Sequence, residues 1–154
     1  MKIQGKDKFL MQLASLPRMM REEARRSLEV SAEETTDLMK RFAPKDEHKL
    51  VVSIGYTFDF APGGGNEAVA QARAAKVETG LAVTMYAGDE TTMVTNKRGQ
   101  RFQNARIQEH GRRTKSGKII KHPFFFPAYR LMHKRALSRL RRALRTGARK
   151  AFGR

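Results

Sequence analysis

Three consecutive phenylalanines between two prolines, in residues 123–128, constrain the fold of this chain more than any other feature. The second proline suits the first turn of a helix, where its missing N–H costs nothing, so the segment predicts the start of a helix. Successive side chains point in different directions in any regular backbone, so the three rings cannot all face one core. At least one of Phe124, Phe125 and Phe126 is therefore expected to be exposed unless another chain covers it. One interpretation is that this segment contacts another subunit. The other is that neighbouring residues of the same chain cover the rings.

A short helix and a basic loop precede this segment. The residues from about Asn104 onward form a helical turn or two ending at Gly111, because glycine readily takes the left-handed conformation at a helix end. The loop that follows, residues 112–122, carries Arg112, Arg113, Lys115 and Lys118. Glu109 stands alone among these cations, and we expect it to form an ion pair with Arg106, Arg112 or Arg113.

Positive charge is concentrated in the second part of the chain. The 154 residues carry a net charge of +17, but residues 1–96 sum to −1, whereas residues 97–154 hold 19 lysines and arginines against one acid and sum to +18. Such a field attracts polyanions, either nucleic acid or an acidic protein surface. The length predicts a single domain with a thin core, which oligomerisation would help to stabilise. Without cysteine the chain can hold neither a disulfide nor a thiolate metal site, which fits synthesis in the cytoplasm.

Two long amphipathic helices are predicted. Residues 17–42 carry apolar side chains every three or four positions, and their charges of alternating sign are interpreted as a solvated face. A shorter helical pattern, residues 6–16, precedes this helix. The second long helix begins near residue 127, with Leu131, Leu137, Leu140 and Leu144 on its apolar face. Its other face carries arginines that no acid along the helix can pair, so they must face solvent or a polyanionic partner: Arg135, Arg139, Arg142, Arg145 and Arg149.

The middle of the chain predicts a small antiparallel sheet. Residues 50–58 are rich in β-branched and aromatic side chains and indicate a first strand. Residues 81–86 and 91–95 indicate two more strands, which turn residues 88–90 would join into a hairpin, and the chain turns again at residues 96–99. The glycine-rich residues 61–66 are interpreted as a surface loop, because no Lys-Ser/Thr pair follows to make a phosphate cradle. Residues 68–75 fit either a brief helix or an extended crossing.

These patterns predict an α+β protein in which a long N-terminal helix and a C-terminal helix pack on a small antiparallel β-sheet. All 154 residues are expected to form one domain. Its parts are a helical segment (1–43), a sheet with loops and a short helix (44–111), the basic loop (112–122), and the aromatic segment with the basic C-terminal helix (123–154).

No catalytic or metal-binding pattern stands out. The four histidines form no HExxH motif and no i,i+4 pair, so a zinc site would need scattered ligands. Glu109 and His110 are adjacent on a helical turn and point in different directions, which argues against an acid–base pair. We therefore predict that the protein is not an enzyme and uses no cofactor. The apolar run of residues 9–16 is too short to span a membrane, so no membrane partner is expected.

Two motifs carry a family resemblance. The first consists of an alanine, a glutamate and a glycine, then a variable loop, then Pro-Phe…Pro-Ala: Ala105, Glu109, Gly111, Pro123, Phe124, Pro127 and Ala128. The second lies upstream: Ala43, Pro44, Asp46, Leu50, Ser53 and Ile54. In this order the motifs resemble those of the tail-completion, or head-tail joining, proteins of long-tailed bacteriophages and gene-transfer particles. His48 replaces the glycine that this family usually has before the leucine.

The resemblance implies a structural protein of the virion neck, made in the host cytoplasm. It would form a ring, hexameric by this resemblance, that joins the head connector to the tail tube or terminates the tail. The expected partners are further copies of the chain, the head connector or head-closure protein, the tail tube protein, and DNA passing through the channel. The expected contact residues are Glu109, Gly111, Arg112, Arg113, Lys115, Lys118, Phe124, Phe125 and Phe126.

The alternative is a sequence-independent nucleic-acid-binding protein whose arginine-rich C-terminal helix lies along phosphates. The charge of residues 97–154 supports this alternative. Against it, the region shows no helix-turn-helix pattern, no zinc knuckle and no interleaved aromatic residues for base stacking.

Overall fold

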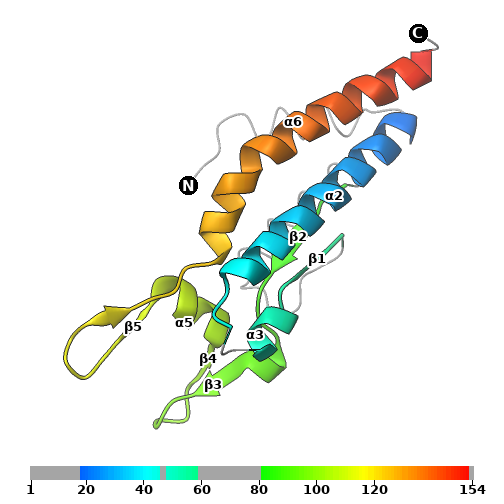
Figure 1. The fold of residues 1–154 in the computed structure, drawn as a ribbon. Coiled ribbons are helices and arrows are strands. Elements are labelled where there is room, and N and C mark those ends of the chain that lie inside the picture. The colour runs from blue at the N-terminus through cyan, green and yellow to red at the C-terminus, as the bar shows by residue number, and fades with distance from the viewer. Residues whose placement is uncertain (1–17, 46–47, 59–80, 153–154) are drawn as a thin grey trace.

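The computed structural model describes residues 18–45, 48–58 and 81–152. Its two dominant elements, α2 (Arg18–Phe42) and α6 (Phe125–Phe152), run side by side (Figure 1). The chain between them forms the short helices α3 (His48–Val52) and α5 (Asn104–His110), the 3-10 helix η1 (Glu90–Thr92) and short strands. The predicted α+β class, with its two long helices, is confirmed.

Within the described residues, the strands form three separate antiparallel pairs rather than one sheet. β1 (Gly55–Thr57) pairs with β2 (Thr84–Tyr86), β3 (Met93–Thr95) with β4 (Arg101–Gln103), and β5 (Arg112–Arg113) with β6 (Ile119–Ile120). The expected turn at residues 96–99 closes the β3–β4 hairpin. The expected basic loop is itself a hairpin, β5–β6, which projects from the body of the molecule (Figure 1).

Two strand predictions were wrong. Residues 81–86 and 91–95 do not pair with each other, because Asp89 caps the 3-10 helix η1 between β2 and β3. The Asp89 carboxylate accepts from the backbone N–H of Thr91 at 2.8 Å, and the backbone N–H of Asp89 donates to the Thr92 hydroxyl at 2.8 Å. Residues 50–58 are not one strand either. Their first part belongs to α3, which buries Leu50 completely and leaves Val52 83 % exposed, and only β1 is extended.

The contact between α2 and α6 is built largely from small side chains. The buried positions of α2 include Ala24, Ser27, Ser31, Ala32 and Thr35. Small residues allow two helix backbones to approach closely, and at Gly147 of α6 an added Cβ would lie 2.7 Å from the Cα of Met20. The buried hydroxyls of Ser31 and Thr35 donate to carbonyls of α2 itself, at 2.7 and 2.6 Å. The helix pair therefore depends on shape complementarity more than on large apolar side chains.

The hydrophobic core lies where the long helices meet α3 and α5. Its buried residues are Met39, Ala43, Leu50, Ile54, Ala105, Phe124 and Ala128. Leu131, expected on the packed face of α6, is 65 % exposed. It lies nine residues from the buried Leu140, about two and a half turns, which places it on the opposite side of the helix.

Several sequence predictions fall on residues outside the described ranges. They are the short helical pattern of residues 6–16, the loop and glycine triplet of residues 60–67, and the undecided residues 68–75.

The close approach at Gly147 makes Gly147→Ala a direct test of the helix packing. In an exposed helix this change normally stabilises by about 1 kcal/mol. Here the new methyl group meets the backbone of Met20, so we expect the free energy of unfolding to fall by about 1–3 kcal/mol instead. Urea unfolding measures the change. Thr146→Ala, at the exposed neighbouring position, is the control and should leave stability within about 0.5 kcal/mol; stabilisation by Gly147→Ala would contradict the packing.

Candidate interaction surface around Glu109 and the aromatic segment

Glu109 joins α5 to the start of α6. Its carboxylate accepts hydrogen bonds from three successive backbone N–H groups, those of Phe124 (2.8 Å), Phe125 (2.9 Å) and Phe126 (3.1 Å). These N–H groups belong to the first turn of α6, where no helical carbonyl can reach them, and the helix dipole also favours a negative charge there. The predicted ion pair of Glu109 with an arginine was wrong. The backbone donors engage both carboxylate oxygens instead.

Gly111 ends α5 and begins the basic hairpin. Its φ of 91° confirms the predicted need for glycine, although its ψ of 162° places it in an extended region rather than in the left-handed helical one. Space also requires glycine, because a Cβ here would lie 2.7 Å from Cγ2 of Ile119 and 3.0 Å from the carbonyl oxygen of Ile120. The backbone N–H of His122 donates to the Gln108 carbonyl at 2.8 Å. The hairpin is thus anchored to α5 at both of its ends.

The three phenylalanines have different environments. Phe124 is completely buried in the core, Phe125 packs partly buried against it, and Phe126 is 45 % exposed. Their rings meet edge-on, with centroids 6.5 Å apart for Phe124–Phe125 and 5.7 Å apart for Phe125–Phe126. The prediction that at least one ring is exposed is confirmed. The inclusion of Phe124 among the contact residues needs correction, because its side chain is used entirely by the protein's own core.

Five exposed apolar residues of the two hairpins and of the start of α6 make up what we call the hairpin surface: Val94, Phe102, Ile119, Ile120 and Phe126. Their exposures lie between 39 % and 57 %. A cleft of about 430 Å³ separates the β3–β4 hairpin from α5 and β6, with Phe102 and Ile120 among its lining residues. The predicted cations Arg112, Arg113, Lys115 and Lys118 are all exposed on the β5–β6 hairpin beside it. The structure therefore brings an apolar surface and a basic rim together.

The arginines of α6 fall into two groups. Arg139 donates to the Glu34 carboxylate at 2.7 Å and to the Ser31 hydroxyl at 3.0 Å, and Arg135 lies 3.4 Å from the same carboxylate. The prediction that all five arginines face solvent or a partner was wrong for Arg139, which is largely covered where it pairs with Glu34 of α2; Arg135 pairs with the same acid but stays exposed. Arg142, Arg145 and Arg149 are exposed.

The ion pairs between α2 and α6 shift the titration of their acids. The hydrogen bond from Arg139 lowers the pKa of Glu34 below its ordinary value of 4.5. In the same way, the hydrogen bond from Lys150, at 2.6 Å, lowers the pKa of Glu23. Both carboxylates are therefore held in the ionised form by cations of α6.

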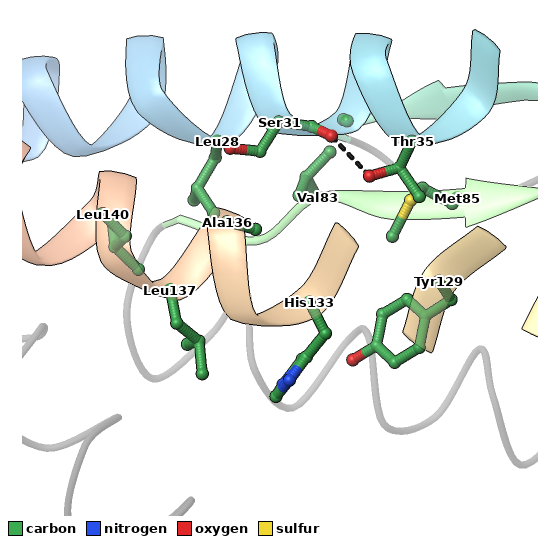
Figure 2. A pocket seen from close by; sticks show the side chains of 11 residues that line it. Leu28, Ser31, Thr35, Val83, Met85, Tyr129, His133, Ala136, Leu137 and Leu140 are labelled. Atoms are coloured by element: carbon green, nitrogen blue, oxygen red, sulfur yellow. Dashed lines mark hydrogen bonds between the residues drawn. The ribbon is translucent and has the colours of Figure 1, made fainter. Parts of the chain in front are cut away.

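A second cleft, of about 210 Å³, lies between α2, α6 and β2, and Figure 2 shows its side chains. The lining is mainly apolar, with Leu28, Val83, Met85 and Leu140 among its members. Polar atoms come from Ser31, Thr35, Tyr129 and His133, and the last two rings have centroids 5.5 Å apart on α6 (Figure 2). The described lining includes no carboxylate to act with His133 as an acid–base pair.

In the part of the chain that the structure describes, no group of three or more His, Asp or Glu side chains is placed to hold a metal ion. Within the same residues, no helix combines the length and the apolar character that a membrane crossing requires. Neither protein-family models, nor curated proteins, nor solved structures match the chain. The resemblance to tail-completion proteins therefore stays a prediction.

Removing the Glu109 carboxylate should destabilise the fold. Glu109→Ala leaves three N–H groups at the start of α6 without their acceptor, and we expect the free energy of unfolding to fall by about 1–3 kcal/mol. Glu109→Gln keeps one acceptor oxygen, so its free energy of unfolding should lie between those of the wild type and Glu109→Ala. The control is Glu90→Ala, which removes only the exposed pair with Arg101 and should cost less than about 0.5 kcal/mol. Equal losses at the two positions would show that Glu109 is an ordinary surface acid.

Glu34 should contribute to stability in a pH-dependent manner. Its folded-state pKa is lowered, so its contribution is present above the unfolded-state value of about 4.5 and is lost as the pH falls through the folded-state pKa. The free energy of unfolding of the wild type should therefore exceed that of Glu34→Gln at neutral pH, and this difference should shrink progressively below about pH 4.5. Urea unfolding at a series of pH values measures it. Glu22→Gln, which removes the exposed pair with Arg18, is the control, and identical pH profiles for the two variants would contradict this role of Glu34.

Proposed function

We propose that the protein is a structural subunit of a phage-type neck, in which copies of the chain form a ring that joins the head connector to the tail tube or terminates the tail. The observation that carries the proposal is the exposure of Phe126 in a rigid setting. Its backbone N–H is bound by Glu109 and its ring contacts Phe125, yet 45 % of the residue faces outward. An exposed aromatic side chain whose position is already fixed loses little entropy when a partner covers it, which favours an interface.

The residues that carry the family resemblance have connected structural roles. Six of the seven buried core residues, all but Met39, come from the two motifs: Ala43, Leu50, Ile54, Ala105, Phe124 and Ala128. Ser53 belongs to the second motif and accepts a hydrogen bond from the backbone N–H of Gly88 at 3.0 Å. Glu109 and Gly111 set the start of α6 and the hairpin. The two motifs, far apart in the sequence, thus form one structural unit, which supports the view that they describe a fold rather than chance matches.

The shape of the hairpin surface favours a ring over a two-fold symmetric dimer. It combines a projecting β5–β6 hairpin with a cleft beside β3–β4. A projection and a hollow at different places on one subunit can engage in a head-to-tail manner, and such contacts produce rings when the rotation closes. The basic rim residues Arg112, Arg113, Lys115 and Lys118 would then face an acidic part of a neighbouring copy, of the connector or of the tail tube.

Phe126→Gln should prevent assembly without unfolding the subunit. The change replaces an exposed ring with an uncharged polar side chain, which leaves the Glu109 carboxylate undisturbed. We expect native mass spectrometry to shift from an oligomer to the monomer, while the free energy of unfolding stays within about 1 kcal/mol of wild type. Met19→Gln is the matched control, because Met19 is also 45 % exposed but lies near the opposite end of the helix pair.

An intact oligomer in the Phe126→Gln variant would show that this surface is not the subunit contact. A wild-type protein that stays monomeric at high concentration, and that electron microscopy never finds at the ends of purified tail tubes, would overturn the proposed function itself.

A further inference from the structure

We propose that the outer face of α6 binds the phosphate backbone of duplex DNA without reading its sequence. Six exposed cations form this face, which we call the cationic stripe: Arg130, Lys134, Arg141, Arg142, Arg145 and Arg149. The proposal goes beyond the ring and does not depend on it, because the stripe belongs to a single subunit.

The stripe lies along one side of α6. At 3.6 residues per turn, its six positions fall within about one third of the circumference of α6. Its ends, Arg130 and Arg149, lie about 28 Å apart along the axis at 1.5 Å per residue. The second half of α6 extends past the strand pairs together with α2 (Figure 1), so these strands do not cover it. A duplex can therefore contact surface cations over about five turns of α6.

Internal pairing distinguishes the stripe from the other cations of α6. Arg135, Arg139 and Lys150 lie on the flank toward α2 and pair with Glu34 or Glu23. In the described ranges, no ion pair or side-chain hydrogen bond engages any of the six stripe residues. Several of them, such as Arg141 and Arg145, are four residues apart, a spacing at which like charges destabilise a helix. A bound polyanion would remove this repulsion.

The composition of the stripe favours phosphate over an acidic protein. Protein interfaces usually have an apolar core from which charged residues are depleted. On this face the side chains between the cations are Leu131, Ser138 and the partly buried Ala148, and the exposed Leu137 lies at its edge. Five of the six cations are arginines, whose planar guanidinium groups bind phosphate oxygens in a bidentate manner. The hairpin surface has the opposite character, since it combines cations with exposed phenylalanine and isoleucine side chains.

Salt-dependent binding of a mixed-sequence duplex of about 30 base pairs to the full-length protein tests the proposal. Each phosphate neutralised contributes about 0.9 to the slope of log affinity against log salt concentration. The variant Arg141→Gln/Arg142→Gln/Arg145→Gln should therefore show a slope shallower by about 2–3 and, at about 0.1 M salt, an affinity at least about tenfold lower. The matched control, Arg18→Gln/Arg26→Gln/Arg41→Gln, lowers the net charge equally but on the exposed face of α2, and its slope should stay close to wild type.

Three results would overturn the proposal. Equal losses in the two triple variants would mean that only net charge matters. A larger loss in Arg112→Gln/Arg113→Gln/Lys115→Gln would place the DNA contact on the hairpin. An unchanged duplex slope in the stripe variant, together with lost binding to polyglutamate, would indicate an acidic protein partner. If the stripe triple variant fails to fold, Lys134→Gln/Arg149→Gln replaces it, with an expected change in slope of about 2. Native mass measured on the same samples reports assembly separately.

Discussion

The fold depends on one carboxylate that reaches across the chain to the first turn of a long helix. Glu109 and Phe124 are 15 residues apart in sequence, with a whole hairpin between them, yet the carboxylate binds the N–H groups of three successive residues. Three adjacent donors fix both the position and the direction of the helix start. As a result Phe124 is directed into the core, whereas Phe126, two positions later, is directed away from it. The Glu109 carboxylate thus determines both which ring of the aromatic segment is buried and which is exposed.

The helix pair imposes a second constraint, because its small side chains bring the backbones close together. At Gly147 even a methyl group would meet the Met20 backbone. Close approach also brings the Glu34 carboxylate of α2 within hydrogen-bond distance of Arg139 of α6, 105 residues away in the chain. Such pairs fix the rotation of α6 about its axis relative to α2. The rotation in turn decides which cations face α2 and which face outward.

The sequence predicted the features that arise from local pattern. The amphipathic period of residues 17–42 agrees with α2 to within one residue, and Gly111 marks the end of α5. The β5–β6 hairpin was expected only as a loop, although Gly117, with a φ of 81°, supplies a turn signal between Thr114 and Lys118. Strand pairing was mispredicted for two reasons: Asp89 caps the 3-10 helix η1 between β2 and β3, and the β-branched Val51 and Val52 lie in α3, which places Leu50 in the core.

The partners of charged groups could not be predicted, because they come from distant segments. Glu109 has arginines beside it in sequence, which suggests an ion pair, and no local pattern reveals N–H donors that a folded hairpin brings near. Arg139 and Arg142 look alike in the helical pattern, and only the rotation of α6 against α2 separates a cation held by Glu34 from one that faces outward.

Cations that are not used internally define the surfaces left for partners, and these surfaces differ in chemistry. The hairpin surface combines exposed rings and isoleucines with cations, which suits a desolvated contact between proteins. The outer face of α6 offers guanidinium groups with little apolar area, which suits a hydrated polyphosphate. The two surfaces meet at the start of α6, where Phe126 of the hairpin surface lies about one turn before Arg130 of the cationic stripe, and the stripe then continues away from the hairpins toward Arg149. Under the two proposals, the hairpin surface would contact neighbouring copies while the part of the stripe beyond Arg130 would stay open to a polyanion.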